Sequence, residues 1–105
     1  MVASSFQVIL SARAFADLDG IVDYIKADSP LNAARVLDRL WESMQSLKDL
    51  PHRYPVIAYL RDPERSVRRM PVPPYLVYYR IVENLGVVRI LTVRHGRQRQ
   101  PRKFE

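Results

Sequence analysis

The stretch DSPLNAARVLDRLWESMQSLKDLP, residues 28–51, decides the fold, because it carries the full pattern of one amphipathic helix. Ser29 is placed to cap the N-terminus, and Pro30 suits the first helical position, where its missing N–H is harmless. Apolar residues then recur at steps of three and four, the spacing of one helix face: Ala33, Leu37, Leu40, Trp41, Met44 and Leu47. We therefore predict a helix that Pro51 ends and that buries Trp41 and Met44 in the core.

A second amphipathic helix is predicted directly before the first, from the N-cap Ser11 to about Asp28. Its apolar stripe comprises Ala14, Leu18, Ile21, Val22 and Ile25, and the residues expected to face solvent are Arg13, Asp17, Asp19, Asp23 and Lys26. Gly20 in mid-helix costs about 1 kcal/mol relative to alanine, so we expect it to mark a close approach of the two helices. Because their connection is short, the helices form an antiparallel hairpin.

Strand patterns flank the helical pair. The predicted strands are 5–10, 66–72, 75–82 and 87–93, and 51–62 reads as a loop with an extended piece near Val56–Leu60. Asn84 and Gly86 tolerate a positive φ, which suits a hairpin turn, and the prolines of 71–74 suit a second tight connection. The order β-α-α-β-β-β predicts an α+β fold, a helical hairpin packed on a small, mostly antiparallel sheet, as one domain over residues 1–105.

Charge is divided unevenly along the chain. Residues 1–60 carry six Lys and Arg against seven Asp and Glu, a net charge of −1, whereas residues 61–105 carry eleven against four, a net charge of +7. Ten of those eleven cations are arginine, whose planar fork of donors matches carboxylate or phosphate in a bidentate way. The C-terminal half is therefore expected to contact an anionic partner.

Composition excludes several other classes of site. The chain has no cysteine, which rules out disulfides and thiolate metal sites and suits a reducing cytoplasm, and its two histidines are too distant to indicate a metal site. Nothing in the sequence indicates a cofactor. No apolar run approaches the roughly 20 residues that span a bilayer. The N-terminus lacks the basic region of a signal peptide, so we expect a cytoplasmic protein without membrane contact.

Two segments carry a resemblance to a known family. The first is ARAFADLDGIVDYIKADSPLNAARVLDRL, residues 12–40, and the second is RRMPVPPYLVYYRIVENLGVVRILTVRHGRQR, residues 68–99. In this order and at this spacing they resemble the RelE/ParE superfamily of bacterial toxins over nearly the whole chain. The run DLDGIVDYIKADSPLNA and the ending VRHGRQR are similar to the ParE branch.

The resemblance implies the toxin of a type II toxin–antitoxin module of the plasmid-stabilisation type. Such a toxin is neutralised by a cognate antitoxin, whose C-terminal segment lies along a groove of the toxin and covers its working surface. RelE-like members cleave messenger RNA in the ribosome, whereas ParE-like members are associated with blocking DNA gyrase and have no established chemistry. We therefore expect a growth-inhibiting toxin that binds and inhibits a target, with gyrase first.

The residues expected to bind the target or the antitoxin are Arg68, Arg69, Arg94, His95, Arg97 and Arg99. The alternative is an endoribonuclease that acts on ribosome-bound messenger RNA through Arg69, His95 and Arg97, with His95 as acid or base. RelE-like ribonucleases commonly use lysine and arginine on the middle strands, or a glutamate with a terminal His-Tyr pair. This sequence departs from both, because residues 66–72 contain no lysine, Leu76 replaces an arginine of the pattern, and glycine follows His95.

The same residues allow plainer interpretations. Arg68 and Arg69 are neighbours on a strand, so their side chains point to opposite faces and at most one faces a given ligand. One face of the strand 75–82 must pack on the helices, so most of its tyrosines belong to the core. The basic tail from about residue 94 is alternatively a solvated extension, above all at Arg102 and Lys103, or part of a nucleic-acid-binding module whose affinity falls steeply with salt.

Overall fold

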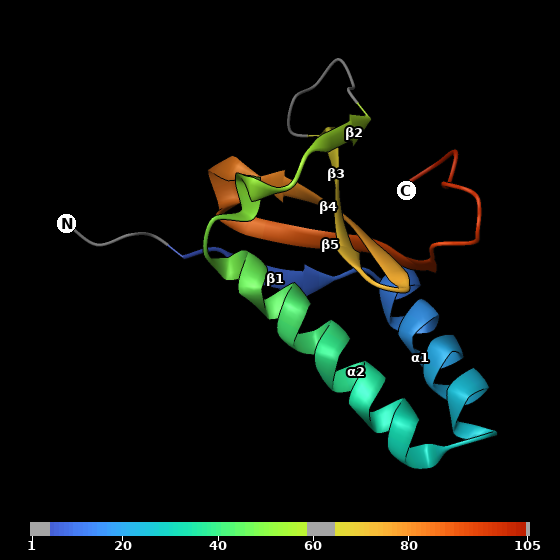
Figure 1. Ribbon diagram of the computed structural model, residues 1–105. Helices are drawn as coiled ribbons and strands as arrows, with labels where there is room; N and C mark the ends of the chain where they lie inside the picture. The colour runs from blue at the N-terminus through green and yellow to red at the C-terminus, as the bar shows by residue number, and fades with distance from the viewer. Residues whose placement is uncertain (1–4, 59–64, 105) are drawn as a thin grey trace.

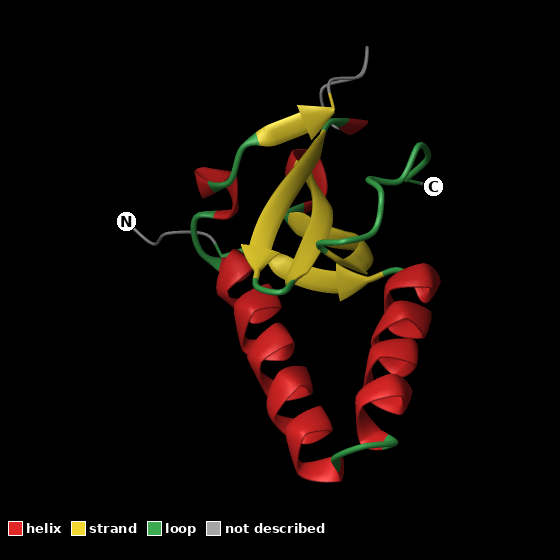
Figure 2. Cartoon of the chain, turned by 45° about the vertical axis from the view of Figure 1, so that its right-hand side comes forward, coloured by secondary structure: helices red, strands yellow, loops and turns green. Residues whose placement is uncertain are grey.

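A helical hairpin and a five-stranded sheet make up the chain in the computed structural model, which describes residues 5–58 and 65–104 (Figure 1). The elements in chain order are β1 (Gln7–Leu10), α1 (Ala12–Lys26), α2 (Pro30–Gln45), the 3₁₀ turns Ser46–Lys48 and Pro51–Arg53, β2 (Val56–Ala58), β3 (Val67–Val72), β4 (Tyr75–Val82), the 3₁₀ turn Glu83–Leu85 and β5 (Val87–His95). Both helices pack on one face of the sheet, so the predicted α+β fold is confirmed (Figure 2).

The strands are ordered β1-β5-β4-β3-β2, with β1 parallel to β5 and the other neighbours antiparallel. The prediction of a mostly antiparallel sheet is therefore correct. Strand β2 confirms the extended piece predicted near Val56–Leu60 as far as the described residues reach, because Val56 and Ala58 pair with β3 at the sheet edge. This strand is short and its register shifts between those two residues, so it lacks the regular alternation that reveals a strand. Tyr59 and Leu60 lie outside the described residues.

Both helices begin where the sequence predicts. The Ser11 hydroxyl accepts a hydrogen bond from the Ala14 backbone N–H at 3.0 Å, and the Ser29 hydroxyl accepts one from the Asn32 backbone N–H at 3.1 Å. Pro30 occupies the first helical position of α2. Each cap satisfies a backbone donor that a helix N-terminus leaves without a partner, which fixes the start of the helix.

The C-terminal end of α2 lies before the predicted end at Pro51. The α-helix ends at Gln45, and the tighter 3₁₀ turn Ser46–Lys48 follows, in which Leu47 is fully buried. Leu50 then adopts a left-handed backbone conformation with φ of 54°, which a right-handed helix does not contain. The tighter turn directs Leu47 into the core, so the chain leaves the helical path earlier than its apolar pattern indicates.

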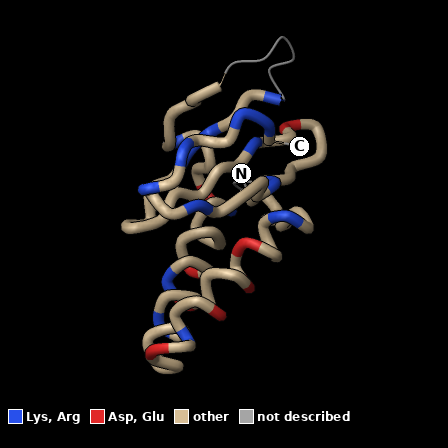
Figure 3. Tube along the Cα trace, turned by 90° about the vertical axis from the view of Figure 1, so that its right-hand side faces the viewer, with Lys and Arg blue, Asp and Glu red and all other residues tan. Residues whose placement is uncertain are grey.

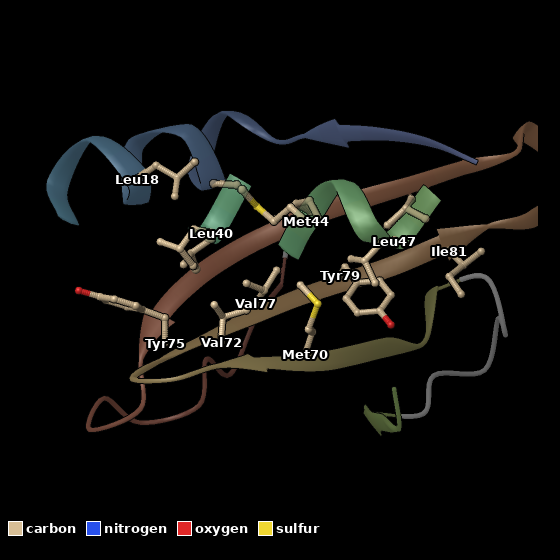
Figure 4. Packing of buried hydrophobic residues seen from close by; sticks show 14 residues of the cluster. Leu18, Leu40, Met44, Leu47, Met70, Val72, Tyr75, Val77, Tyr79 and Ile81 are labelled. Carbon is tan, nitrogen blue, oxygen red and sulfur yellow. The ribbon is translucent and has the colours of Figure 1, made fainter. Parts of the chain in front are cut away.

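The main core lies between the helices and one face of the sheet. Figure 4 shows its centre, where α2 and the turn after it meet β3 and β4: Leu40, Met44, Leu47, Met70, Val77 and Tyr79. Met44 is buried as predicted, but the Trp41 side chain is 45% exposed, so that prediction is wrong. Trp41 follows Leu40 by one residue, about 100° around the helix axis, and therefore points away from the inward direction that Leu40 and Met44 share.

A smaller apolar cluster covers the opposite face of the sheet, called here the outer face. Its buried members are Val67, Tyr78 and Leu91. Phe104, from the C-terminal segment, packs on Tyr78 with ring centroids 5.3 Å apart. Tyr75 and Tyr79 belong to the main core and Tyr78 to this cluster, so the prediction that most of these tyrosines are core residues is confirmed.

Candidate functional site

Strand β5 continues past the end of β1, and α1 becomes its neighbour there. Pairing of the two strands ends at Leu10 and Ile90, after which the Ser11 hydroxyl donates a hydrogen bond to the Leu91 carbonyl at 2.9 Å. The same hydroxyl caps α1, so one side chain fixes the start of the helix and its position beside β5. The last residues of β5 are thereby held against the helix.

The Asp17 carboxylate extends this attachment. It accepts hydrogen bonds from the Val93 backbone N–H at 2.9 Å and from the Thr92 hydroxyl. The prediction that Asp17 faces solvent is therefore wrong, whereas Asp19 and Asp23 are exposed as expected. Because β1 does not reach Val93, the carboxylate supplies the acceptor that a neighbouring strand would otherwise provide.

The chain turns sharply after β5 and is fixed to the tight connection between β3 and β4. The Gly96 N–H donates to the Pro74 carbonyl at 2.8 Å, and a Cβ on Gly96 would lie only 3.2 Å from that oxygen. The His95 ring packs edge-on against Tyr75 with centroids 5.6 Å apart, and its Nδ1 accepts from the Arg97 backbone N–H at 3.0 Å. That bond requires an unprotonated Nδ1, which places the proton of the neutral ring on Nε2.

A groove of about 560 Å³ runs between α1 and the end of β5, called here the α1–β5 groove. It is lined by Asp17, Gly20, Ile21, Tyr24, Ile25, Tyr75, Val93, Arg94, His95, Arg97 and Gln98. The helix forms one wall, which is largely apolar at Ile21 and Ile25. The end of β5 and the following turn form the other wall, where His95 and Arg97 supply imidazole and guanidinium groups.

Gly20 lies in the groove rather than between the helices. A Cβ built on Gly20 meets nothing within 4 Å, so the prediction of a close helix–helix approach at this residue is wrong. The two helices diverge as they approach the sheet, as Figure 2 shows. Gly20 is one of the residues of α1 that line the groove. Tyr24, one turn further along the same helix wall, is 85% exposed. The groove is therefore open over this part of α1.

The outer face holds a different group of the predicted residues. Arg69 is opposite Tyr78 in the sheet, and its guanidinium lies 3.4 Å from the side-chain oxygen of Gln100. Arg94 donates to the backbone carbonyl of Arg99 at 3.3 Å. The Lys103 carbonyl accepts from the Arg13 guanidinium at 2.9 Å, so the segment after β5 follows the outer face instead of leaving the protein as a wholly solvated tail.

Arg68 lies apart from the other predicted site residues. Its guanidinium donates to the carbonyls of Tyr54 at 2.6 Å and His52 at 3.0 Å. Beside it, the Tyr79 hydroxyl donates to the Pro51 carbonyl at 2.6 Å, and burial raises the pKa of Tyr79 to about 12 although Arg68 and Arg53 act to lower it. These contacts attach Arg68 to the 51–54 turn, and its part in binding the target or the antitoxin stays a prediction.

The sheet separates the residues that a ribonuclease would use together. His95 is opposite Tyr75 and shares the side of the sheet that faces the helices, whereas Arg69 is opposite Tyr78 on the outer face. A general acid or base and the cations that stabilise the transition state must contact the same phosphate. His95 and Arg97 both line the groove, whereas Arg69 lies on the other face of the sheet.

Charge follows the two layers of the fold. Figure 3 shows most of the Lys and Arg on the sheet and the C-terminal segment, whereas the helical hairpin carries most of the Asp and Glu together with a smaller number of Lys and Arg. Within the described ranges, no group of three or more His, Asp or Glu residues is arranged to hold a metal ion. In the same part of the chain, no helix is long and apolar enough to cross a membrane.

The sequence gives only part of the signal for the groove residues on α1. Asp17, Gly20 and Tyr24 follow one another at steps of three and four, which places them on one face of α1. Their residue types alone indicate a solvated face on which the glycine lowers the stability of the helix. Only the attachment of Asp17 to β5, across 75 and 76 positions of sequence, reveals that this face lines a groove.

The comparisons with family models and with curated proteins both identify toxins as the relatives of this chain. The family model described as "ParE toxin of type II toxin-antitoxin system, parDE" matches residues 8–100. A curated relative, the protein named Toxin RelE2 from Caulobacter vibrioides, is 39% identical over 91 residues, which cover 86% of this chain and 94% of the relative.

Solved structures share the fold at lower identity. A chain of the chromosomal ParDE system of Pseudomonas aeruginosa superimposes with a TM-score of 0.68 at 20% identity, over 89% of this chain and 98% of that one. A chain of the RelBE2 complex of Mycobacterium tuberculosis gives a TM-score of 0.65 at 22% identity, over 87% and 98%. At these identities the likeness concerns the fold alone.

Proposed function

Since the chain belongs to the ParE toxin family of type II toxin–antitoxin systems, we propose that it inhibits growth by binding a cellular target. The target we propose is DNA gyrase, and the contact surface is the end of β5 with the turn that follows it. On this proposal the protein acts in the cytoplasm, uses no cofactor and performs no chemistry of its own.

One observation carries the choice of binding over catalysis. Arg69 and His95 lie on opposite faces of the sheet, so Arg69 does not join His95 and Arg97 in the groove, and the set of three residues for a phosphoryl-transfer reaction is incomplete there. His95 is also committed to local structure, since its Nδ1 accepts from the Arg97 N–H and its ring packs on Tyr75. A surface that presents imidazole and guanidinium donors without a general acid–base pair is suited to recognition of an anionic or acidic partner.

The second partner in this proposal is a cognate antitoxin. The comparison structures include a ParDE system and a RelBE2 toxin–antitoxin complex, and the curated relative is itself named a toxin. Expressed alone, the chain should therefore arrest growth, and co-expression of the protein encoded by the neighbouring gene should restore it.

A supercoiling assay tests the proposed target directly. Purified toxin should inhibit relaxed-plasmid supercoiling by gyrase in a dose-dependent way, and Arg97→Glu should weaken that inhibition because it reverses a charge on the contact surface. The matched control is Arg35→Glu, which reverses an exposed charge on α2 outside the groove. Unaffected supercoiling at concentrations that arrest growth would reject gyrase as the target.

A ribosome-dependent endoribonuclease is the second candidate, and the name RelE2 of the curated relative favours it. If the His95 imidazole is the acid or base, His95→Gln should lower cleavage of ribosome-bound messenger RNA by roughly 10²-fold or more. His52→Gln is the matched control, because this second histidine is exposed and lies outside the groove. Full cleavage by the His95→Gln variant would remove the imidazole from the mechanism.

A further inference from the structure

We propose that Asp17 is a positioning residue for the contact surface of the proposed function. Its carboxylate holds the last part of β5 and so sets the direction in which His95 and Arg97 meet the target. The inference rests on the proposed function, because that function places the contact surface at the end of β5 and in the turn that follows it. Asp17 acts through the strand rather than by its own contact with the target.

The first argument is a change in the course of β5 just before the contact surface. Ile90 pairs with Tyr79 and Thr92 pairs with Tyr78, so Leu91 is an extra residue that β4 does not match. A β-bulge of this kind bends its strand and redirects the side chains that follow it. The direction of β5 beyond Leu91 therefore depends on what holds the strand there.

The second argument is that α1 takes the place of the strand that ends. The last pair between β1 and β5 is at Ile90, whereas β4 continues beside β5 to its end. Beyond that pair, the Ser11 hydroxyl holds the Leu91 carbonyl at 2.9 Å, and the Asp17 carboxylate holds the Val93 N–H at 2.9 Å. Two attachments fix a direction, whereas the Ser11 attachment alone would let the strand pivot about Leu91.

The third argument is the buried partner of the carboxylate. The Thr92 hydroxyl is fully buried and donates to the same Asp17 oxygen as the Val93 N–H. A buried hydroxyl without an acceptor is costly, so the folded protein retains this contact. Val93 precedes His95 by two residues and Arg97 by four, so a small rotation of the strand at this point displaces both side chains.

The contact surface has a second anchor on its other side. The Gly96 N–H donates to the Pro74 carbonyl at 2.8 Å, which attaches the turn after β5 to the connection between β3 and β4. His95 therefore lies between this bond and the attachments that Asp17 makes. Because the second anchor remains when Asp17 is removed, we expect the toxin to bind its target more weakly rather than to lose the surface altogether.

Inhibition of gyrase supercoiling by variants of the full chain tests the inference. Asp17→Ala removes the acceptor, so the concentration that gives half inhibition should rise roughly 10-fold. Asp17→Asn keeps an oxygen that can accept both hydrogen bonds, so its inhibition should remain within about threefold of the wild type. The Val93 amide hydrogen should exchange about 10-fold faster in Asp17→Ala, whereas that of Val88, where β1 still pairs, should not change.

A double variant separates the position of the strand from the stability of the fold. Asp17→Ala alone leaves the Thr92 hydroxyl buried without its acceptor, which should lower the melting temperature. Addition of Thr92→Val removes the second polar partner and should regain most of that loss. The Val93 N–H still lacks its attachment, so inhibition should stay roughly 10-fold weaker than in the wild type. Recovery of inhibition together with stability would show that Asp17 acts through stability alone and would overturn the inference.

The matched control is Asp19→Ala, which removes an exposed carboxylate of α1 outside the groove and changes the net charge equally. If Asp17→Ala inhibits as well as this control, or if Asp17→Asn is as weak as Asp17→Ala, the inference is wrong and the proposed function stands. If wild-type toxin arrests growth without inhibiting gyrase, gyrase is rejected, and the same order of variants in growth arrest decides the inference. If wild-type toxin does neither, the proposed function and the inference fail together.

Discussion

Arginine side chains differ in their hydrogen-bond partners between the two ends of the sheet. Near the 46–54 turns, the guanidinium of Arg53 donates to the Asp49 carbonyl at 3.1 Å, and that of Arg68 donates to the Tyr54 carbonyl at 2.6 Å. At the end of β5, the Arg97 guanidinium is exposed beside the α1–β5 groove, and within the described residues no hydrogen bond or ion pair engages it.

The difference shows why a count of arginines overstates a binding surface. A guanidinium that donates to buried or partly buried carbonyls holds the backbone in place, and its positive charge is not there to bind a partner. A guanidinium that the fold leaves in solvent is free to meet a partner. Arg68 belongs to the first kind and Arg97 to the second, although both lie in the strongly basic half of the chain.

The largest expected effect is on stability at the 46–54 end. Leu47→Ala removes a fully buried side chain from the main core, so the free energy of unfolding should fall by about 2–5 kcal/mol. Tyr24→Ala in the groove should change it by less than about 0.5 kcal/mol, because that side chain is 85% exposed. Urea unfolding followed by circular dichroism measures both. Similar losses in the two variants would mean that the groove is as much a part of the stable core as the turn.

The next effect compares two arginines directly. Arg68→Ala leaves two backbone carbonyls without their donor, which should lower the free energy of unfolding by about 1–3 kcal/mol. Arg97→Ala should lower it by less than about 0.5 kcal/mol and should act on partner binding instead. Growth arrest measured beside the melting temperature separates the two roles. A stable, inactive Arg68→Ala variant would instead show that Arg68 contacts the target or the antitoxin.

A smaller effect concerns Tyr79 and depends on pH. Tyr79→Phe removes the hydrogen bond to the Pro51 carbonyl, so near neutral pH the variant should be less stable by about 0.5–1.5 kcal/mol. The pKa of Tyr79 is raised from 10.0 to about 12 in the folded protein, chiefly by burial. The folded state therefore retains this proton more tightly than the unfolded state, and stability falls where only the unfolded state loses it.

The sign of that dependence gives a measurable window. The contribution from Tyr79 is fully present below pH 10 and is lost as the pH rises from about 10 toward 12. Wild-type protein should therefore lose stability faster than Tyr79→Phe across this range, with the other tyrosines common to both. Parallel unfolding curves for the two proteins at alkaline pH would show that burial does not hold the proton.

What the sequence predicts well is set by local interactions. Ser29 and Pro30 define the start of α2 through contacts within one turn, and the structure confirms both. Trp41 and Leu40 differ only by one step around the same helix, and the apolar stripe is wide enough to admit either, so the pattern does not tell which is buried. The structure decides through the position of the sheet, which the local pattern does not contain.

The candidate site depends more on contacts that are distant in sequence. His95 and Arg97 could be found from composition and from the resemblance to a family, and both line the groove. Asp17 could not, because the two groups in β5 that donate hydrogen bonds to its carboxylate are more than seventy positions away along the chain. The separation of Arg69 from His95 also required the strand register, since their distance in sequence does not fix which face of the sheet each one occupies.

The smallest expected effect tests whether the C-terminal segment remains on the outer face. The Phe104 ring packs on Tyr78, but Phe104 is itself partly exposed, so Phe104→Ala should lower the free energy of unfolding by less than about 1 kcal/mol. Phe15→Ala is the matched control, since Phe15 is 54% exposed on α1 and alanine is the better helix former there. A loss confined to Phe104→Ala, together with faster hydrogen exchange at Leu91, would show that the segment covers β5. Equal stability of the two variants and unchanged exchange would mean that the outer face is open to a partner in the same way as the groove.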